Sequence, residues 1–297
     1  MKQLLCALLM LGMGLVCYSQ VDDGTWIKEL GISLGVMNCN TDIGGLPIDF
    51  QSFKMSGGVY FEQSYLQKIG FRLEGTVGTV TATDKRAVNY DLKGRNLDFT
   101  SNIKEISLLA VIHPLNLVLK DYTSVLSPYF LAGVGYFGFS PRTRLNSQWI
   151  YLQPLHTEGE GFPETGRPNY KLSGLNIPVG GGLQYNISDD LFLRGEAVYR
   201  FLSTDYLDDV STTYIDPNLF DKNLYPGDAA LARRLADRSY ELVANSVRPP
   251  GSVRGSPKKD AYYSINLKLG FRLGTGSGSF YNNYSKKKHG CKAQKYL

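Results

Sequence analysis

Residues 263–273 read YSINLKLGFRL, and this stretch decides the fold. Its apolar positions are Tyr263, Ile265, Leu267, Leu269, Phe271 and Leu273, and they alternate with Ser264, Asn266, Lys268, Gly270 and Arg272. Side chains of a strand point alternately to its two faces, so one face here is apolar and the other carries charge. Such a strand needs lipid or a core on one side and polar neighbours on the other.

The same alternation recurs along the chain, as in Leu30, Ile32 and Leu34 against Gly31 and Ser33. We expect eight strands, at residues 26–37, 53–65, 69–80, 102–113, 127–139, 175–185, 191–201 and 261–273. The links at 66–68 and 186–190 are short and the one at 114–126 is moderate, whereas the other four are long. This pattern predicts an all-β fold: an eight-stranded antiparallel transmembrane β-barrel with long extracellular loops and a short loop helix.

Residues 1–19 have the features of a signal peptide, with Lys2 before a short apolar core and a cleavage site before Gln20. Cys17 is an alternative, as a lipidated cysteine. No apolar run of about 20 residues follows Gln20, so a barrel is the remaining way to cross a bilayer. The expected organisation is therefore a signal peptide at 1–19, a barrel at 20–273 and a basic periplasmic tail at 274–297.

The net charge of +5 is a local effect. Lys2 leaves with the signal peptide, and five more lysines stand at 286, 287, 288, 292 and 295. The rest of the chain is close to neutral, so no nucleic-acid partner is expected. The 20 tyrosines and 32 glycines suit a barrel surrounded by outer-membrane lipid. With short turns facing the periplasm, an even number of strands places both termini there.

Charged residues fall on the predicted inward faces of the strands. The set is Glu62, Arg72, Glu74, Glu105, Arg194, Glu196, Arg200, Lys268 and Arg272. Eight strands enclose an interior that side chains can fill. We therefore expect an ion-paired plug, with a proton or ion path through the cluster as the alternative.

The connection from about 202 to 260 is too long to be a simple link. Leu231, Leu235 and Leu242 lie at helical spacing, which predicts a helix over 228–247 that caps the barrel mouth or contacts another protein. The preceding acidic segment contains Asp205, Asp208, Asp209 and Asp216. These carboxylates are expected to structure the loop; Ca²⁺ binding is the alternative, although the spacing is not that of an EF-hand. No cofactor is expected.

The histidines His113, His156 and His289 fall in three separate regions, which excludes a three-histidine metal site. A hydrolase would need His156 beside a carboxylate of the acidic segment, and no such arrangement can be derived from sequence. We therefore do not expect an enzyme.

Cys39 and Cys291 are expected at opposite ends of the barrel, too far apart to form a disulfide. Cys291 lies in a basic tail segment together with Lys286, Lys287, Lys288 and His289. These five residues form a candidate surface for a periplasmic partner, with a mixed disulfide through Cys291 as one possibility. A solubilising tail is the alternative.

Several segments resemble a known family. They are HPLN at 113–116, PYFLAGVG at 128–135, WIYLQPLHTEG at 149–159, TDYLDDVSTTYID at 204–216 and KKKHGC at 286–291. Together they resemble Bacteroidota outer-membrane barrels of the PorG type. The resemblance implies a subunit of a type IX-like protein secretion machine, in contact with a periplasmic ring lipoprotein and its partner. It implies no catalytic residues.

Two other functional interpretations remain open at this point. In the first, the long loops make the protein an extracellular ligand-binding or adhesion barrel. In the second, the protein is a barrel-embedded hydrolase. The expected function is an outer-membrane subunit that anchors or organises the secretion machine through its periplasmic contacts.

Overall fold

The computed structural model describes residues 26–45, 49–118 and 125–273. In these residues eight strands form a closed antiparallel barrel, and each pairs with the strands before and after it while the last pairs with the first. The barrel strands are β1 (Trp26–Asn40), β2 (Lys54–Tyr65), β3 (Ile69–Thr83), β4 (Asp98–Ile112), β5 (Leu126–Gly138), β8 (Ser173–Asn186), β9 (Leu191–Leu202) and β10 (Ala261–Leu273). Closure leaves no unpaired edge in the barrel wall.

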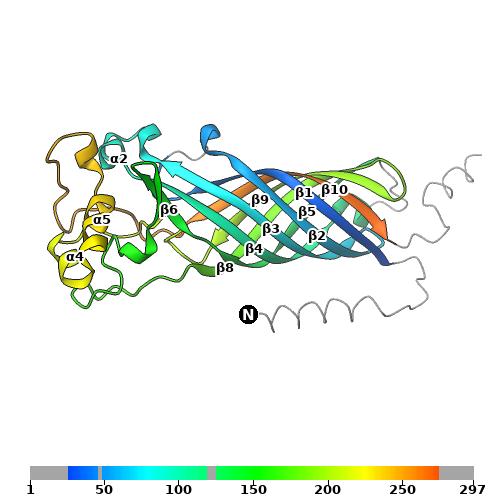
Figure 1. Cartoon of the computed structure of the whole chain (residues 1–297). Helices are drawn as coiled ribbons and strands as arrows, with labels where there is room; N and C mark the ends of the chain where they lie inside the picture. Colours follow the sequence, from blue (N-terminus) through cyan, green and yellow to red (C-terminus); the bar gives the residue numbers. More distant parts are fainter. Residues whose placement is uncertain (1–25, 46–48, 119–124, 274–297) are drawn as a thin grey trace, which may run out of the picture.

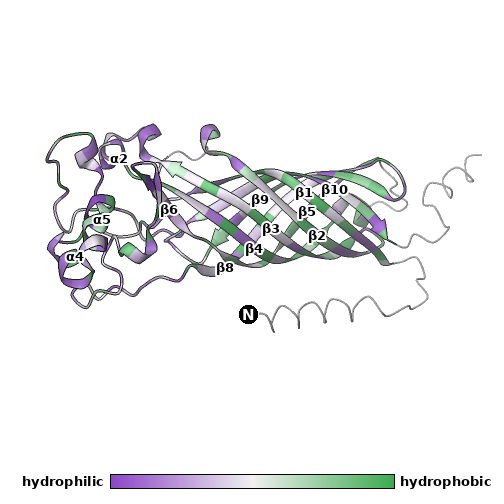
Figure 2. Ribbon diagram, in the orientation of Figure 1, coloured by the Kyte–Doolittle hydropathy of each residue, from purple (hydrophilic) through white to green (hydrophobic). Residues whose placement is uncertain are grey.

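The alternation of residues 263–273 has the predicted structural consequence. In β10, Ser264, Asn266 and Lys268 are at most 5% exposed, whereas Ile265 and Leu267 are more than half exposed. Figure 2 shows the apolar colour along the barrel strands, while the end of the molecule that carries the helices labelled α4 and α5 is largely hydrophilic. The predicted fold class, an eight-stranded antiparallel barrel, is confirmed.

The two ends of the barrel differ sharply in the described chain (Figure 1). Trp26 pairs with Tyr65 and Leu273 pairs with Lys28, so the chain enters and leaves the barrel beside the short β2–β3 turn. Leu66 and Gln67 of this turn have φ angles of 50° and 51°, which suits a tight hairpin. The link that follows β4 also lies at this end and begins with α3 (Pro114–Val118).

The long connections meet at the other end and form what we call the loop domain: residues 41–45, 49–53, 84–97, 139–172 and 203–260. It holds the 3₁₀ turns η1 (Phe50–Ser52), η2 (Asp84–Arg86), η3 (Gln153–Leu155) and η4 (Ser239–Glu241), the helices α2 (Tyr90–Arg95), α4 (Asn218–Asn223) and α5 (Pro226–Ala236), and the hairpin β6 (Pro141–Leu145) to β7 (Gln148–Tyr151). Among the described residues, no helix combines the length and apolar character needed to cross a membrane.

A hydrophobic core joins the loop domain to the adjacent mouth of the barrel. Leu152, Phe220 and Leu235 of the loop domain belong to the same buried cluster as Met37 and Phe137 of the strands. The long connections therefore fold as one body on the barrel, since each contributes side chains to a shared core.

Glycines inside the barrel make room for aromatic rings. Gly31 and Gly270 are cross-strand partners in β1 and β10. A Cβ atom on Gly31 would lie 2.5 Å from the ring of Tyr60, and one on Gly270 would lie 2.5 Å from its hydroxyl oxygen. The ring of Phe192 comes even closer to such an atom on Gly270. The close approach of these two rings explains why two inward positions carry no side chain.

Two features of the loop domain differ from the sequence prediction. The β6–β7 hairpin was not predicted; it pairs with the outer end of β4 and turns at Asn146 and Ser147, both with positive φ. The helix predicted over 228–247 ends at Ala236. Asp237 is extended, and its carboxylate accepts hydrogen bonds from the backbone N–H groups of Ser239 and Arg248, which replaces a continuing helix.

Candidate functional site

The structure places all nine predicted lumen residues inside the barrel, each at most 7% exposed. Arg72 of β3 is central: its guanidinium lies 2.9 Å from Glu62 and 2.5 Å from Glu196. Lys268 of β10 extends the network, with its Nζ atom 2.6 Å from Glu74 and 2.7 Å from Glu196. Each of these carboxylates therefore has a cationic partner within the barrel.

Arg194 forms a second hub beside Arg72. Its guanidinium lies 2.6 Å from Glu29 and 2.8 Å from Glu62. Glu29 also contacts Arg272 at 3.3 Å. The sequence analysis missed Glu29, although it is two residues before Gly31 on the inward face of β1. Extending the alternation backwards from Gly31 would have identified it.

Glu105 and Arg200 form a separate pair nearer the loop domain. Their charged groups are 2.6 Å apart, and the hydroxyl of Tyr262 donates to Glu105 at 2.8 Å. Counting Glu29, the named lumen groups of the described chain comprise five carboxylates and five cations. Rings of Tyr60, Tyr129 and Phe192 lie against the guanidinium groups of Arg72 and Arg194. These charges are therefore balanced and paired inside the barrel, the arrangement of an ion-paired plug.

The four predicted aspartates of the acidic segment do not form one cluster. Asp216 is exposed and accepts a hydrogen bond from the backbone N–H of Asn218, where it shapes the turn before α4. Asp205, by contrast, is buried and accepts from the hydroxyl of Ser211 at 2.6 Å. Both contacts are local and serve the shape of the loop.

Asp208 and Asp209 are fully buried in the loop domain. Asp208 accepts hydrogen bonds from the backbone N–H groups of Ile43 and Val210, both at 3.0 Å, and so joins the β1–β2 loop to the β9–β10 loop. Burial raises the pKa of Asp208 to about 8, and the nearby Asp42 carboxylate acts in the same direction. Asp209 accepts from Thr157 and Tyr170, and burial raises its pKa to about 6.

Glu158 connects the segments 149–159 and 204–216. Its carboxylate accepts from the backbone N–H groups of Ser211 and Thr212 at 3.0 and 2.9 Å, and it pairs with Arg254 at 3.0 Å. Neighbouring Glu160 is also buried, and its Oε1 atom has no hydrogen-bond partner among the described residues. Burial, with Asp209 and Glu158 nearby, raises the pKa of Glu160 to about 8. The sequence analysis did not identify these groups.

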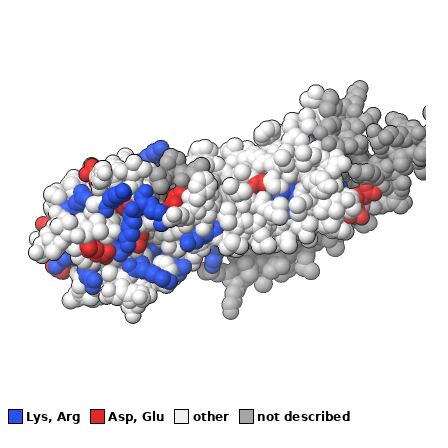
Figure 3. Space-filling model, turned by 90° about the horizontal axis from the view of Figure 1, so that it is seen from above, with Lys and Arg blue, Asp and Glu red and all other residues white. Residues whose placement is uncertain are grey.

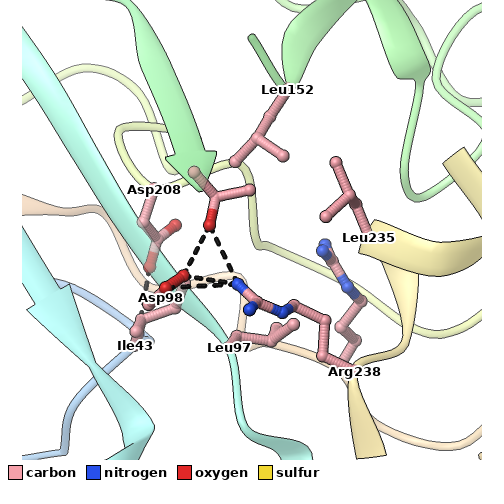
Figure 4. Close-up of a pocket in the computed structure, with 9 residues that line it drawn as sticks. Ile43, Leu97, Asp98, Leu152, Asp208, Leu235 and Arg238 are labelled. Carbon is pink, nitrogen blue, oxygen red and sulfur yellow. Dashed lines mark hydrogen bonds and ion pairs between the residues drawn. The ribbon is translucent and has the colours of Figure 1, made fainter. Parts of the chain in front are cut away.

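Arg238 fixes the segment after α5 to the barrel (Figure 4). Its guanidinium lies 2.5 Å from Asp98 at the start of β4 and donates to the hydroxyl of Thr143 on β6 at 2.9 Å. It also pairs with Glu241 at 2.9 Å. One side chain thus connects three separate parts of the chain.

Arg95, the last residue of α2, also connects separate parts of the chain. It pairs with the buried Asp84 at 2.7 Å and donates to the backbone carbonyl oxygens of Asp42 and Arg254. The β1–β2, β3–β4 and β9–β10 loops therefore meet at this guanidinium. These contacts make the loop domain a preorganised structure.

The remaining predicted residues do not assemble into a site. Among the described residues, no group of three or more His, Cys, Asp or Glu side chains is arranged to hold a metal ion. His113 contacts Ser127 near the short-turn end, whereas His156 packs on Phe162 in the loop domain. The Nδ1 atom of His156 has no hydrogen-bond partner in the described chain, so no carboxylate orients this ring through it. Cys39 is buried and unpaired within the same residues.

The signal peptide expected at 1–19 and the tail residues Lys286, Lys287, Lys288, His289 and Cys291 lie outside the described residues.

Comparison with solved structures gives similarities at low sequence identity. Neisserial surface protein A is 7% identical with a TM-score of 0.40, over 83% of this chain and 97% of that one. Ail of Yersinia pestis, in complex with the heparin analogue sucrose octasulfate, is 12% identical with a TM-score of 0.36, over 83% and 99%. OprG from Pseudomonas aeruginosa is 12% identical with a TM-score of 0.37, over 84% and 95%. Similarities at this level carry no functional argument.

No curated protein matches the sequence. A family model described as "Domain of unknown function (DUF6089)" matches residues 2–216, which is more than half of the chain. The chain therefore belongs to the DUF6089 family.

Proposed function

We propose that the protein is an outer-membrane β-barrel that anchors a folded loop domain and does not act as a channel. The observation that carries this proposal is the filled lumen, in which Arg72, Arg194 and Lys268 each contact at least two carboxylates. Solute passage would require these buried ion pairs to separate, which leaves charges without partners and is strongly unfavourable.

The outer surface of the barrel supports the membrane location. Leu30, Ile32 and Leu34 of β1 are 52%, 54% and 64% exposed, and the other strands present similar side chains. Figure 3 shows that charged side chains gather over the loop domain, while most of the visible barrel surface carries none. An exposed apolar band on a closed barrel suits lipid, because every backbone group of the wall can be paired within the wall.

The orientation follows from the connections. In outer-membrane barrels short turns face the periplasm and long loops face outward. The loop domain then lies on the cell surface, and both described chain ends, at Trp26 and Leu273, lie at the periplasmic face. Under this orientation the tail from residue 274 extends into the periplasm.

The resemblance to PorG-type barrels extends the proposal to a subunit of a type IX-like secretion machine. The partner is then a periplasmic ring lipoprotein with its companion protein, met by the tail around Lys286 and Cys291. Support comes from two of the resembling segments, at 149–159 and 204–216, which contact each other through Thr157–Asp209 and through Glu158. The two segments that resemble PorG-type barrels therefore pack together in the loop domain.

Co-purification from native outer membranes tests the secretion proposal. The preparation is kept non-reducing, and wild type is compared with Cys291→Ala and with a variant carrying Gln at Lys286, Lys287 and Lys288. Cys39→Ala is the matched control, because its thiol is buried in the described structure. A periplasmic lipoprotein that is lost or weakened only in the tail variants supports the proposal. A barrel that purifies alone in every preparation contradicts it.

A second candidate function is extracellular ligand binding or adhesion, and the preorganised loop domain favours it. Replacing residues 203–260 by a short turn should abolish this function while leaving the barrel inserted, and removing residues 274–297 should have no effect. The secretion role predicts the opposite sensitivity. Assaying both deletions in the same strain therefore separates the two functions.

A further inference from the structure

A cavity of about 660 Å³ opens on the loop domain. Its walls come from three connections that are distant in sequence: the β1–β2 loop with Asp42, the start of α2 with Asn89 and Asp91, and the segment that contains Arg248 and Val253. Binding sites for small molecules usually have volumes of about 300–1,000 Å³. The cavity thus has the size of a ligand site.

The cavity walls are held in place from below. Buried Arg95 lines the cavity and binds Asp84, the carbonyl oxygen of Asp42 and that of Arg254. The Asp42 carboxylate also accepts from the backbone N–H and hydroxyl of Ser256, at 2.6 and 3.0 Å. A ligand would therefore meet groups that are already positioned, which reduces the entropy cost of binding.

Charged side chains of both signs line the cavity. Asp42, Asp91 and Arg248 form no side-chain ion pair with any described residue, and the guanidinium of Arg248 donates to the backbone oxygen of Asp91 at 3.2 Å. The other cations, Arg95 and Arg254, are already paired with Asp84 and Glu158. The negative charges of Asp42 and Asp91, which have no cationic partner among the described residues, disfavour an anionic ligand, and three guanidinium groups disfavour a metal ion. Leu92, Tyr214 and Val253 add apolar surface.

We propose that this cavity binds a neutral oligosaccharide. Sugar hydroxyl groups both donate and accept, so they satisfy the Asp42 and Asp91 carboxylates, the Asn89 amide and the Arg248 guanidinium together. The C–H faces of a sugar ring suit Leu92 and Val253. This inference goes beyond the anchoring role and is independent of the tail and its partner.

Direct binding to the purified full-length protein in detergent tests the proposal. The probes are a panel of neutral oligosaccharides that includes maltotriose and chitotriose, together with a sulfated heparin tetrasaccharide. Arg248→Gln and Asp91→Asn each remove one charged contact, and both keep the backbone bonds of the loop. Arg144→Gln is the matched control, because this exposed residue lies on β6 outside the cavity and stacks on Trp149.

The expected result is saturable binding of a neutral member of the panel, weakened about 10-fold in each cavity variant and unchanged in R144Q. Three results would overturn the proposal: no neutral probe binds, only the sulfated probe binds, or R248Q and D91N bind the neutral probe as well as wild type does. The compact electrophoretic mobility of the unheated barrel shows that each variant is folded. A negative result leaves the anchoring role untouched, since that role is tested by co-purification and by conductance.

Discussion

At the scale of single residues, the barrel interior depends on charge balance. Glu196 lies between Arg72 and Lys268, at 2.5 and 2.7 Å, and also accepts the hydroxyl of Tyr129 at 2.8 Å. Each partner is almost fully buried. Such an arrangement adds little net stability compared with an apolar core, but removing one member leaves a buried charge exposed to its full desolvation cost.

Glu196→Gln should therefore lower the free energy of unfolding by roughly 3–5 kcal/mol. Urea unfolding of the detergent-folded protein, followed by tryptophan fluorescence, measures the change. Glu164→Gln is the matched control; Glu164 pairs with Lys222 on the surface of the loop domain, and its loss should not be measurable. Equal urea midpoints for E196Q and wild type would show that the buried ion pairs of Glu196 do not contribute to the stability of the barrel.

At the scale of elements, the loop domain buries several carboxyl groups whose ionised form is disfavoured by burial. Burial raises the pKa of Asp208 and Glu160 to about 8 and those of Asp205 and Asp209 to about 6. A carboxyl group with a raised pKa favours the folded form while it is protonated. This stabilisation is complete below about pH 4 and is lost as the pH rises through 6 to 8.

The loop domain should therefore open more often at about pH 8.5 than at about pH 6. Hydrogen exchange over residues 204–216, corrected for intrinsic rates, should show lower protection at the higher pH. Glu160→Gln removes a buried charge whose Oε1 atom has no partner in the described chain, so it should reduce the pH dependence. Asp216→Asn, at an exposed turn, should leave it unchanged. Protection that rises with pH in wild type would refute the assignment.

Arg238 provides a second test at this scale. Arg238→Met removes the contacts to Asp98, Thr143 and Glu241, and hydrogen bonds to charged groups contribute about 1.5–3 kcal/mol each. Exchange over residues 226–247 should accelerate at least about 10-fold, while the barrel strands keep their protection. Arg234→Met, from the exposed side of α5, serves as the comparison. If R238M and R234M exchange alike, Arg238 does not hold this segment.

The elements also show what the sequence could predict. Strand alternation is local and periodic. The strands and their inward-facing charged residues can therefore be predicted because every second residue of a strand, as in β9 and β10, faces the same side. The interior of the loop domain has no such period. Glu158 meets Arg254 across 96 residues and Arg238 meets Asp98 across 140. Contacts of this kind depend on tertiary folding, and no spacing rule reveals them.

At the scale of the whole molecule, the barrel has an apolar outer surface, a filled interior and a folded domain at one end. This arrangement suits a protein whose barrel anchors a folded loop domain at the membrane. The loop domain shares its hydrophobic core with the barrel mouth through Met37 and Phe137, so the anchor and the domain form one body. The central claim is that nothing passes through this body.

Electrical recording across a planar lipid bilayer that contains the purified protein tests this claim most directly. Protease protection of the barrel in liposomes first shows that the protein is inserted. If the ion pairs close the lumen, the current should be indistinguishable from that of the bare membrane in concentrated KCl. Steady, stepwise conductance from the inserted wild-type protein would contradict it, because the ion pairs around Arg72 and Arg194 would then not close the lumen.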